Sequence, residues 1–267
     1  MPGILLRIPY IQNKVSEVAT TQLSGHLGVP VKIGNVDIEW FNRLVLEGLY
    51  LEDQDGKVMF EANHVAAGFE IMPLLEGKFV FTTVRLFGFS FNLRKHTPES
   101  PLNLQFVIDA FASKDSIKKE KNIDLRFNSI MIRRGNFSYN VDSEKETPGK
   151  FNAKHIDIKN LSAKISLKAF NKDSVNAHIK KMSFDEASGF SLNKLSLNVV
   201  GNRDSAFVQD FEVRLPQTNL KIGRARIDLS EIDSLPALLN NAPIDLNITP
   251  SQICLKDLSP FVPAFKN

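Results

Sequence analysis

Residues 87–94 read Phe-Gly-Phe-Ser-Phe-Asn-Leu-Arg, and this stretch decides the fold class. The large apolar side chains fall on the odd positions, whereas the even positions from 90 onward carry serine, asparagine and arginine. Successive side chains of a β-strand point to opposite faces of a sheet, so this period of two predicts a strand with one apolar and one polar face. We expect the apolar face to carry Phe87, Phe89, Phe91 and Leu93.

The same alternation recurs along most of the chain after Pro30. It is clearest in Val36, Ile38 and Trp40; Ile123, Leu125 and Phe127; Ala163, Ile165 and Leu167; Leu195, Leu197 and Val199; and Ile244, Leu246 and Ile248. Alternating strands are typical of an antiparallel sheet with one buried face, whereas the strands of a parallel α/β core are apolar throughout. The sequence therefore predicts a mainly β fold with an antiparallel sheet that has one apolar face.

The composition supports a folded protein and excludes several classes. Hydrophobic residues make up 43% of the chain and charged residues 24%, which is typical of a globular protein rather than a disordered one. The net charge of +3 comes from 33 basic and 30 acidic residues mixed along the chain, so a clustered nucleic-acid-binding face is not expected. The single cysteine, Cys254, excludes an internal disulfide and a thiolate metal cluster.

Apolar residues recur every three to four positions in residues 9–27, which predicts an amphipathic helix that ends at Gly28. This helix either caps the end of a sheet or lies at a membrane interface. Two further helices are expected within residues 101–112 and 230–240, and a hairpin turn at residues 53–56. We divide the chain into four parts. They are an N-terminal helix that is a remnant of a membrane anchor or adjacent to one (1–29), a first β unit (30–112), a charged joint (113–122) and a second β unit that continues the sheet (123–267).

Motifs for catalysis or cofactor binding are missing from the sequence. None of the five histidines belongs to an H-E-x-x-H pattern, and the 14 glycines form neither G-x-G-x-x-G nor G-x-x-x-x-G-K. Gly88-Phe89-Ser90 and Gly189-Phe190-Ser191 begin like a nucleophile elbow but lack its second glycine. We therefore expect a protein that is not an enzyme and that holds no cofactor, metal or catalytic residue.

Residues 65–80, followed by Val84, Leu86 and the Phe-rich strand, carry a recognisable signature. A strand runs into Pro73, Leu74, Leu75, any residue, Gly77 and Lys78, and a second strand follows. This pattern resembles the AsmA-like family, and within it the TamB-type translocation and assembly module proteins. The amphipathic N-terminal segment, the early strand at 36–40 and the segment 253–263 are also similar, and the agreement is best over residues 8–111.

The resemblance implies an elongated, curved sheet in the periplasm, fixed to the inner membrane by an N-terminal anchor. It also implies that residues 30–112 and 123–267 are AsmA-like β units, and that the protein serves outer-membrane biogenesis by moving phospholipid. The chain lacks the anchor and is much shorter than such proteins. We therefore interpret it as an N-terminal fragment or as a product whose start was placed late.

Two functions and one alternative fold follow as hypotheses. The first is phospholipid transport between inner and outer membrane along an apolar β groove. The expected lining of that groove is Phe69, Ile71, Phe79, Phe81, Phe87, Phe89, Phe91 and Leu93. The second is a scaffold for outer-membrane protein assembly, which pairs a sheet edge with an outer-membrane β-barrel partner. The same alternation also permits a closed β-sandwich without a ligand.

Overall fold

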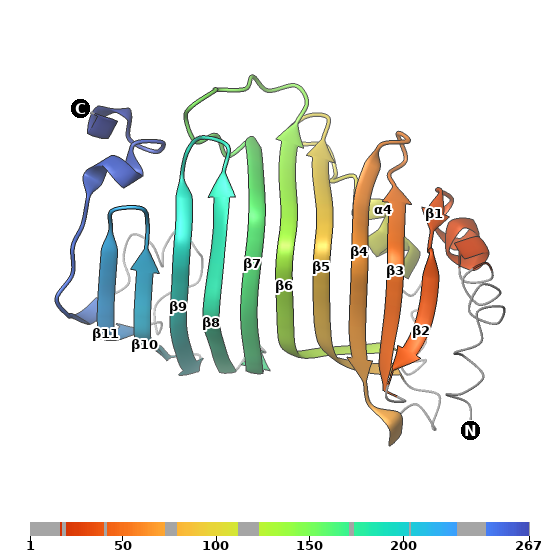
Figure 1. Ribbon diagram of the computed structural model, residues 1–267, viewed down its shortest axis with the longest axis horizontal. Coiled ribbons are helices and arrows are strands. Elements are labelled where there is room, and N and C mark those ends of the chain that lie inside the picture. Colours follow the sequence, from red (N-terminus) through yellow and green to blue (C-terminus); the bar gives the residue numbers. More distant parts are fainter. Residues whose placement is uncertain are drawn as a thin grey trace. The chain divides into compact units, whose positions relative to one another are not determined.

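The structure is a computed structural model that describes residues 17, 20–39, 42–72, 79–111, 123–170, 174–202, 204–228 and 244–266. The fold is mainly β, as predicted, and the strand pairings with a defined register are antiparallel. The neighbouring strands at residues 79–95 and 123–141 instead run in the same direction, because Phe91 lies beside Phe137 and the Lys95 carbonyl accepts from the Asp142 N–H (Figure 1). The first strands are β1 (Val31–Lys32), β2 (Asn35–Glu39), β3 (Arg43–Glu52), β4 (Val58–Phe69), β5 (Phe79–Lys95) and β6 (Ile123–Val141). They are followed by β7 (His155–Phe170), β8 (Ser174–Glu186), β9 (Ser191–Asn202), β10 (Ser205–Arg214), β11 (Asn219–Asp228) and β12 (Ile244–Ile248).

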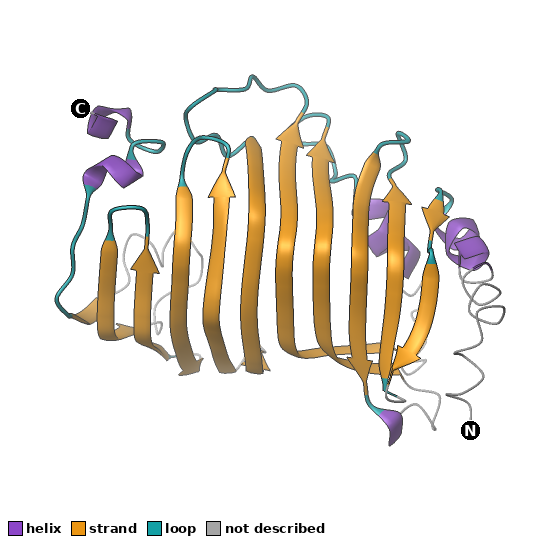
Figure 2. Ribbon diagram, in the orientation of Figure 1, coloured by secondary structure: helices purple, strands orange, loops and turns teal. Residues whose placement is uncertain are grey.

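The strands are hydrogen-bonded in the order β1-β3-β4-β5-β6-β7-β8-β9-β10-β11-β12, and β2 also pairs with β3 (Figure 1). Neighbours in the sheet are therefore mostly neighbours in the sequence. Helical segments are few: residues 20–27, the helix α4 (Gln105–Phe111), and the 3-10 helices η1 (Leu255–Leu258) and η2 (Pro263–Lys266) (Figure 2). No helix among the residues described is both long and apolar enough to cross a membrane.

Two compact units divide the chain. Unit 1 consists of Met1–Phe127, Ile132–Thr147 and Asn152–Asn160, and unit 2 of Asn128–Met131, Pro148–Phe151 and Leu161–Asn267. Unit 1 thus holds β1 to β5 and the larger part of β6, and unit 2 holds β8 to β12. The expected joint at 113–122 and the expected helix at 230–240 lie outside the described residues.

The N-terminal helix of unit 1 packs against the first strands. Leu23 and Leu27 contact a buried cluster of Val31, Ile33 and Val36. The Thr20 hydroxyl accepts a hydrogen bond from the Ile33 N–H, at 3.2 Å. Gly28, with φ of +71°, ends the helix in the left-handed conformation that favours glycine. The predicted helix is confirmed over residues 20–27, and residues 9–16 lie outside the described part. The described turns pack on the sheet, as expected of a helix that caps its end.

Two other local predictions are confirmed. The hairpin turn at residues 53–56 joins β3 to β4, with the Gly56 N–H donating to the Asp53 carbonyl and the Asp53 N–H to the Lys57 carbonyl. The Asp53 carboxylate also accepts from the N–H groups of Asp55 and Lys57, as expected of an aspartate that stabilises a turn. The helix expected within residues 101–112 is α4.

The strands of unit 1 change the phase of their alternation midway. Gly48 in β3 and Gly88 in β5 have φ of +62° and +59°, and the registers place Asn63 of β4 between them. Rotation about φ at one residue turns the following side chains to the other face of a strand. Leu44 and Leu46 before Gly48, and Leu49 and Leu51 after it, accordingly all pack against one cluster. We call Gly48, Asn63 and Gly88 the kink row.

The kink row corrects one prediction. Phe87 does not share a face with Phe89 and Phe91, because Gly88 separates them. The ring of Phe87 lies under the guanidinium of Arg134, at 5.5 Å, and its exposed fraction is 39%. Phe89 is only 6% exposed and its ring stacks on Phe60, at 6.1 Å between centroids. Strict alternation therefore fails at this one position and holds on either side of it.

Unit 2 contains the same kind of phase change, and here the registers prove it. Two residues of β10, Asp210 and Phe211, occupy the space opposite a single residue of β9, and Asp210 has φ of +52°. This is a β-bulge, which shifts the alternation of the bulged strand. The step brings the apolar residues on both sides of Asp210 to one face, namely Ala206 and Val208 before it and Phe211 and Val213 after it.

Candidate functional site

One face of the unit 1 sheet is apolar over three neighbouring strands, and its β3 side packs against the cluster of Val31, Ile33 and Val36. Four cross-strand rows run over β3, β4 and β5 on this face, and every side chain in them is apolar. They are Leu44, Ala67 and Val84; Leu46, Val65 and Leu86; Leu49, Ala62 and Phe89; and Leu51, Phe60 and Phe91. We call the surface formed by these four rows the apolar face.

Aromatic rings form the part of the apolar face that follows Gly88 along β5. The Phe91 ring lies 5.7 Å from Phe60 and 6.2 Å from Phe137 of β6, in edge-to-face geometry in both cases. The space over Gly135 is filled by the ring of Phe89, with which a Cβ at that position would collide. Phe60, Phe91 and Phe137 are half-buried, so this aromatic row retains accessible apolar surface. Phe rings have no polar tip that needs a hydrogen-bond partner.

The structure brings together only part of the predicted groove lining. Phe89, Phe91 and Leu93 follow Gly88 on β5, with Phe89 buried and the other two half-buried. Phe69 is buried at the end of β4, whereas Ile71 lies beyond that strand and is 45% exposed. The backbones of Phe79 and Phe81 belong to β5, but their side chains are outside the described part. Phe87 lies on the opposite face, and Pro73, Leu74, Leu75, Gly77 and Lys78 are outside the described residues.

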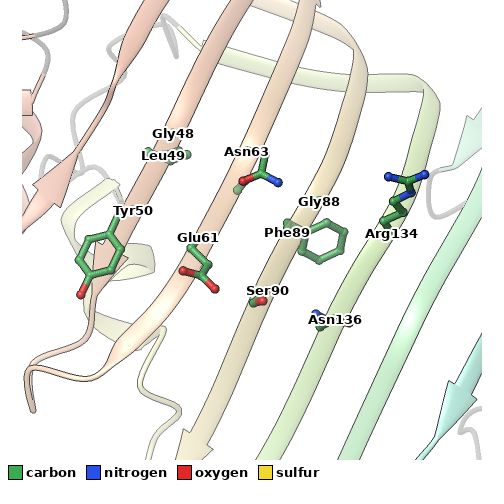
Figure 3. A pocket seen from close by; sticks show the side chains of 11 residues that line it. Gly48, Leu49, Tyr50, Glu61, Asn63, Gly88, Phe89, Ser90, Arg134 and Asn136 are labelled. Carbon is green, nitrogen blue, oxygen red and sulfur yellow. The ribbon is translucent and has the colours of Figure 1, made fainter.

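A pocket lies at the kink row, and residues of both faces line it, Leu49, Ala62 and Phe89 from the apolar rows and polar residues from the opposite face (Figure 3). The pocket has a volume of about 430 Å³, and Tyr50, Glu61, Ser90 and Asn136 line it beside Arg134. Asn63 fills the space over Gly88, where a Cβ would lie 2.6 Å from its Nδ2 atom. The Tyr50 hydroxyl donates to Glu52 at 2.9 Å, and this hydrogen bond, together with the nearby carboxylates, raises the pKa of Tyr50. Among the residues that line the pocket are one carboxylate, Glu61, and one guanidinium, Arg134, and not the pair of carboxylates typical of glycoside hydrolases.

A cluster of charges ties the turn of β3 and β4 to the ends of β5 and β6. Arg94 contacts Asp53 at 3.0 Å, Asp55 at 2.6 Å and Asp142 at 3.5 Å, and it is largely buried. Burial by itself raises the pKa of Asp53, but hydrogen bonds from Asn103 and from two backbone N–H groups, with the charge of Arg94, outweigh it. The pKa of Asp53 is therefore lowered. Every group in this cluster has a structural partner, so we assign it to stability.

One histidine lies among acids: His96 contacts Asp55 at 3.2 Å and Asp142 at 3.4 Å, beside Arg94. No group of three or more His, Cys, Asp or Glu side chains in the described part of the chain is placed to hold a metal ion. His155 contacts Asn140 and the Glu144 carbonyl, and His178 contacts Asn198. The Cys254 thiol donates to the side-chain oxygen of Gln217, at 3.5 Å.

Sequence reasoning missed the kink row, although a signal was present. In β3, β4, β5, β10 and β11 the apolar face follows a spacing of two, three and two residues, as in Leu44, Leu46, Leu49 and Leu51. The step of three falls at a glycine in β3, β5 and β11, and at Asn63 and Asp210 in the other two. Gly48, Gly88 and Asp210 have a left-handed backbone there, which these residue types tolerate best. An interrupted period of two with Gly, Asn or Asp at the interruption would have predicted the step.

Comparisons with models of protein families, with curated proteins and with solved structures find no match for this chain.

Proposed function

We propose that this chain is a non-enzymatic protein of the cell envelope that binds the acyl chains of phospholipid on the apolar face of unit 1. The observation that carries the proposal is the set of four cross-strand rows, which contain no polar side chain over β3, β4 and β5. An apolar surface this continuous on one sheet calls for an apolar partner. The half-buried row of Phe60, Phe91 and Phe137 provides accessible surface for that partner.

The physical chemistry favours transfer over storage. An acyl chain of about 15 methylene groups, at ~0.8 kcal/mol each, gains about 12 kcal/mol on leaving water. The same chain gains almost nothing on leaving a bilayer, because lipid tails are as apolar as the protein surface. A carrier of this kind takes lipid from one membrane and releases it to another. We therefore propose transport of phospholipid between inner and outer membrane, in the periplasm, as the resemblance to the AsmA-like family also implies.

The face assignment of β5 supplies a matched pair of variants to test this proposal. Phe91→Asp places a charge on the apolar face, and Phe87→Asp places the same charge four residues away on the opposite face. Native mass spectrometry with lipid extraction on the purified protein then compares both with wild type. We expect bound phospholipid in wild type and in Phe87→Asp, and loss of the lipid in Phe91→Asp. Circular dichroism checks that both variants remain folded.

Two results would argue against the proposal. Folded wild type that carries no lipid and takes up none from vesicles would remove the basis for an acyl-chain site. Equal lipid loss in both variants would show that the lipid does not depend on the apolar face.

The edge strand β12 supports a second candidate, a scaffold that pairs with a β-barrel partner of the outer membrane. This strand has only five residues, and its Leu246 and Ile248 are 44% and 57% exposed. The sheet order ends at β12, so among the described residues its outer backbone groups have no strand partner. Such an edge is a template for strand addition. Two results together would favour this candidate. A cross-linker placed at position 246 would capture a β-barrel protein, and the purified wild type would carry no lipid.

A further inference from the structure

One end of unit 2 carries features that the acyl-chain site does not explain. The β8–β9 turn (187–190), the β10–β11 turn (215–218) and the segment 252–266 meet there (Figure 2). The Asp257 carboxylate accepts from the Gln217 N–H at 2.9 Å, and the Phe261 ring lies 5.0 Å from Phe190. We call these three segments, together with the basic pocket beside them that Lys181, Lys194 and Arg214 line, the rim.

The rim exposes large apolar side chains although its backbone is fixed. The exposed fractions are 59% for Ile253, 53% for Leu255, 45% for Phe261 and 41% for Val262. Cys254, between the first two, is held by Thr218, whose hydroxyl accepts from its N–H at 3.0 Å and donates to its carbonyl at 3.3 Å. Large apolar side chains presented on a fixed backbone indicate a surface that binds a partner.

Basic side chains surround a pocket beside the same segment. The pocket has a volume of about 650 Å³, and Lys181, Lys194 and Arg214 line it with Asn219 and Gln252. One carboxylate lies among them: Glu212 contacts Lys194 at 2.5 Å and Arg214 at 2.6 Å, and the hydrogen bond from Lys194 leads the effects that lower its pKa. A second carboxylate, Asp257, accepts from the N–H of Gln217 on the pocket wall. Three cations against two carboxylates still leave an excess of positive charge, which suits a phosphate group.

The pocket and the exposed apolar side chains form one surface. Gln252 lines the pocket and directly precedes Ile253 in the chain. Asn219, on the pocket wall, exchanges two backbone hydrogen bonds with Gln252, at 2.8 and 2.9 Å.

We propose that the rim binds the surface of a bilayer that contains anionic phospholipid. Ile253, Leu255, Phe261 and Val262 enter the boundary between headgroups and acyl chains, and Lys181, Lys194 and Arg214 bind headgroup phosphate. Charge complementarity selects this partner: lysine is depleted at protein–protein interfaces, whereas apolar side chains beside lysines are typical of surfaces that lie on anionic membranes. The inference rests on the proposed function, since a carrier of acyl chains must meet a membrane to load and unload.

Vesicle co-sedimentation of the full chain tests the proposal. The probes are phosphatidylcholine vesicles with and without phosphatidylglycerol. Two rim variants are compared with wild type: Ile253→Ser with Leu255→Ser, and Lys181→Ala with Lys194→Ala. The matched controls are Val200→Ser, which is 49% exposed in β9, and Lys168→Ala, which is exposed at the opposite end of the strands.

We expect wild type to bind the anionic vesicles, and the apolar rim variant to bind them more than about tenfold more weakly. The lysine variant loses the preference for phosphatidylglycerol, and both controls bind like wild type. Rim variants that bind as wild type does, or controls that lose binding equally, overturn the proposal.

The same samples separate this inference from the proposed function. In native mass spectrometry the rim variants keep their bound phospholipid, whereas Phe91→Asp loses lipid but still binds vesicles. Loss of both properties in the rim variants, with folding retained, would show that the rim belongs to the lipid site and is not a separate docking surface.

Discussion

Phe87 and Phe89 are separated by one residue of β5, yet they lie on opposite faces of the unit 1 sheet. Gly88, with φ of +59°, turns the strand between them. Arg134 covers the ring of Phe87 on the polar face, and Phe60 stacks on the ring of Phe89 on the apolar face. One glycine therefore decides which phenylalanines can meet a lipid.

Gly88 should be intolerant of a side chain. We expect Gly88→Ala to lower the free energy of unfolding by about 1 to 2 kcal/mol, because a left-handed backbone is unfavourable for alanine. The new Cβ would lie 2.6 Å from the Nδ2 atom of Asn63 and would displace that amide. Urea titration measures the change. Gly223→Ala is the control, since its φ is not left-handed and its nearest neighbour, a Thr249 methyl group, is 3.5 Å away. An equal loss in both variants would contradict the assignment.

Asp210 provides a second test of the phase change, in unit 2. Its φ is +52°, and its carboxylate accepts a hydrogen bond from the Asn198 amide at 2.9 Å. Asp210→Asn should change the free energy of unfolding by less than about 0.5 kcal/mol, because asparagine tolerates this backbone conformation. Asp210→Val should cost about 2 kcal/mol, since a β-branched residue does not. Similar stabilities for the two variants, measured by thermal unfolding, would speak against a strained bulge.

Asp53 should make stability depend on pH. Its pKa is lowered in the folded state, so its contribution is present above the unfolded value of about 3.9 and is lost as the pH falls through the lower, folded value. We expect Asp53→Ala to cost about 2 to 4 kcal/mol near neutral pH, and the difference from wild type to shrink in acid. Urea titrations at neutral and acidic pH measure both.

The control for Asp53 is Asp142→Ala. Asp142 is 38% exposed and contacts the same arginine at 3.5 Å, so its removal should cost less than about 1 kcal/mol. If the difference in free energy of unfolding between wild type and Asp53→Ala stays the same at acidic pH, the Asp53 carboxylate is not the source of the effect.

Site-directed fluorescence can test the apolar face without a charge in it. We expect an environment-sensitive dye on Phe91→Cys, in a Cys254→Ser background, to shift its emission to the blue when phospholipid vesicles are added. The same dye on Phe87→Cys should not respond, because that position faces Arg134. A response at position 87 alone would reverse the assignment of the two faces.

Local features of the sequence predicted much of this fold. The alternation in residues 89–94 predicted the faces of β5 beyond Gly88, and Asp53 and Gly56 predicted the first hairpin turn. The phase change was not predicted because a strict period of two was applied through Gly88. The step of three residues from Leu86 to Phe89 was therefore not recognised as a rotation of the backbone. The partners of Arg94 come from three turns and strand ends, so only the fold could bring them together. The family motif at residues 73–78 lies outside the described part and stays a prediction.

The kink row also has a consequence for how the chain finds its strand pairing. Long strands that alternate with a period of two can slip by two residues and still present the same face, so many registers compete. A slip of two residues between β4 and β5 would move the left-handed Gly88 away from Asn63, whose side chain fills the space above it. The left-handed glycines thus make the native register more stable than the registers shifted by two residues. They disfavour misfolded strand pairings, which the apolar pattern alone does not distinguish.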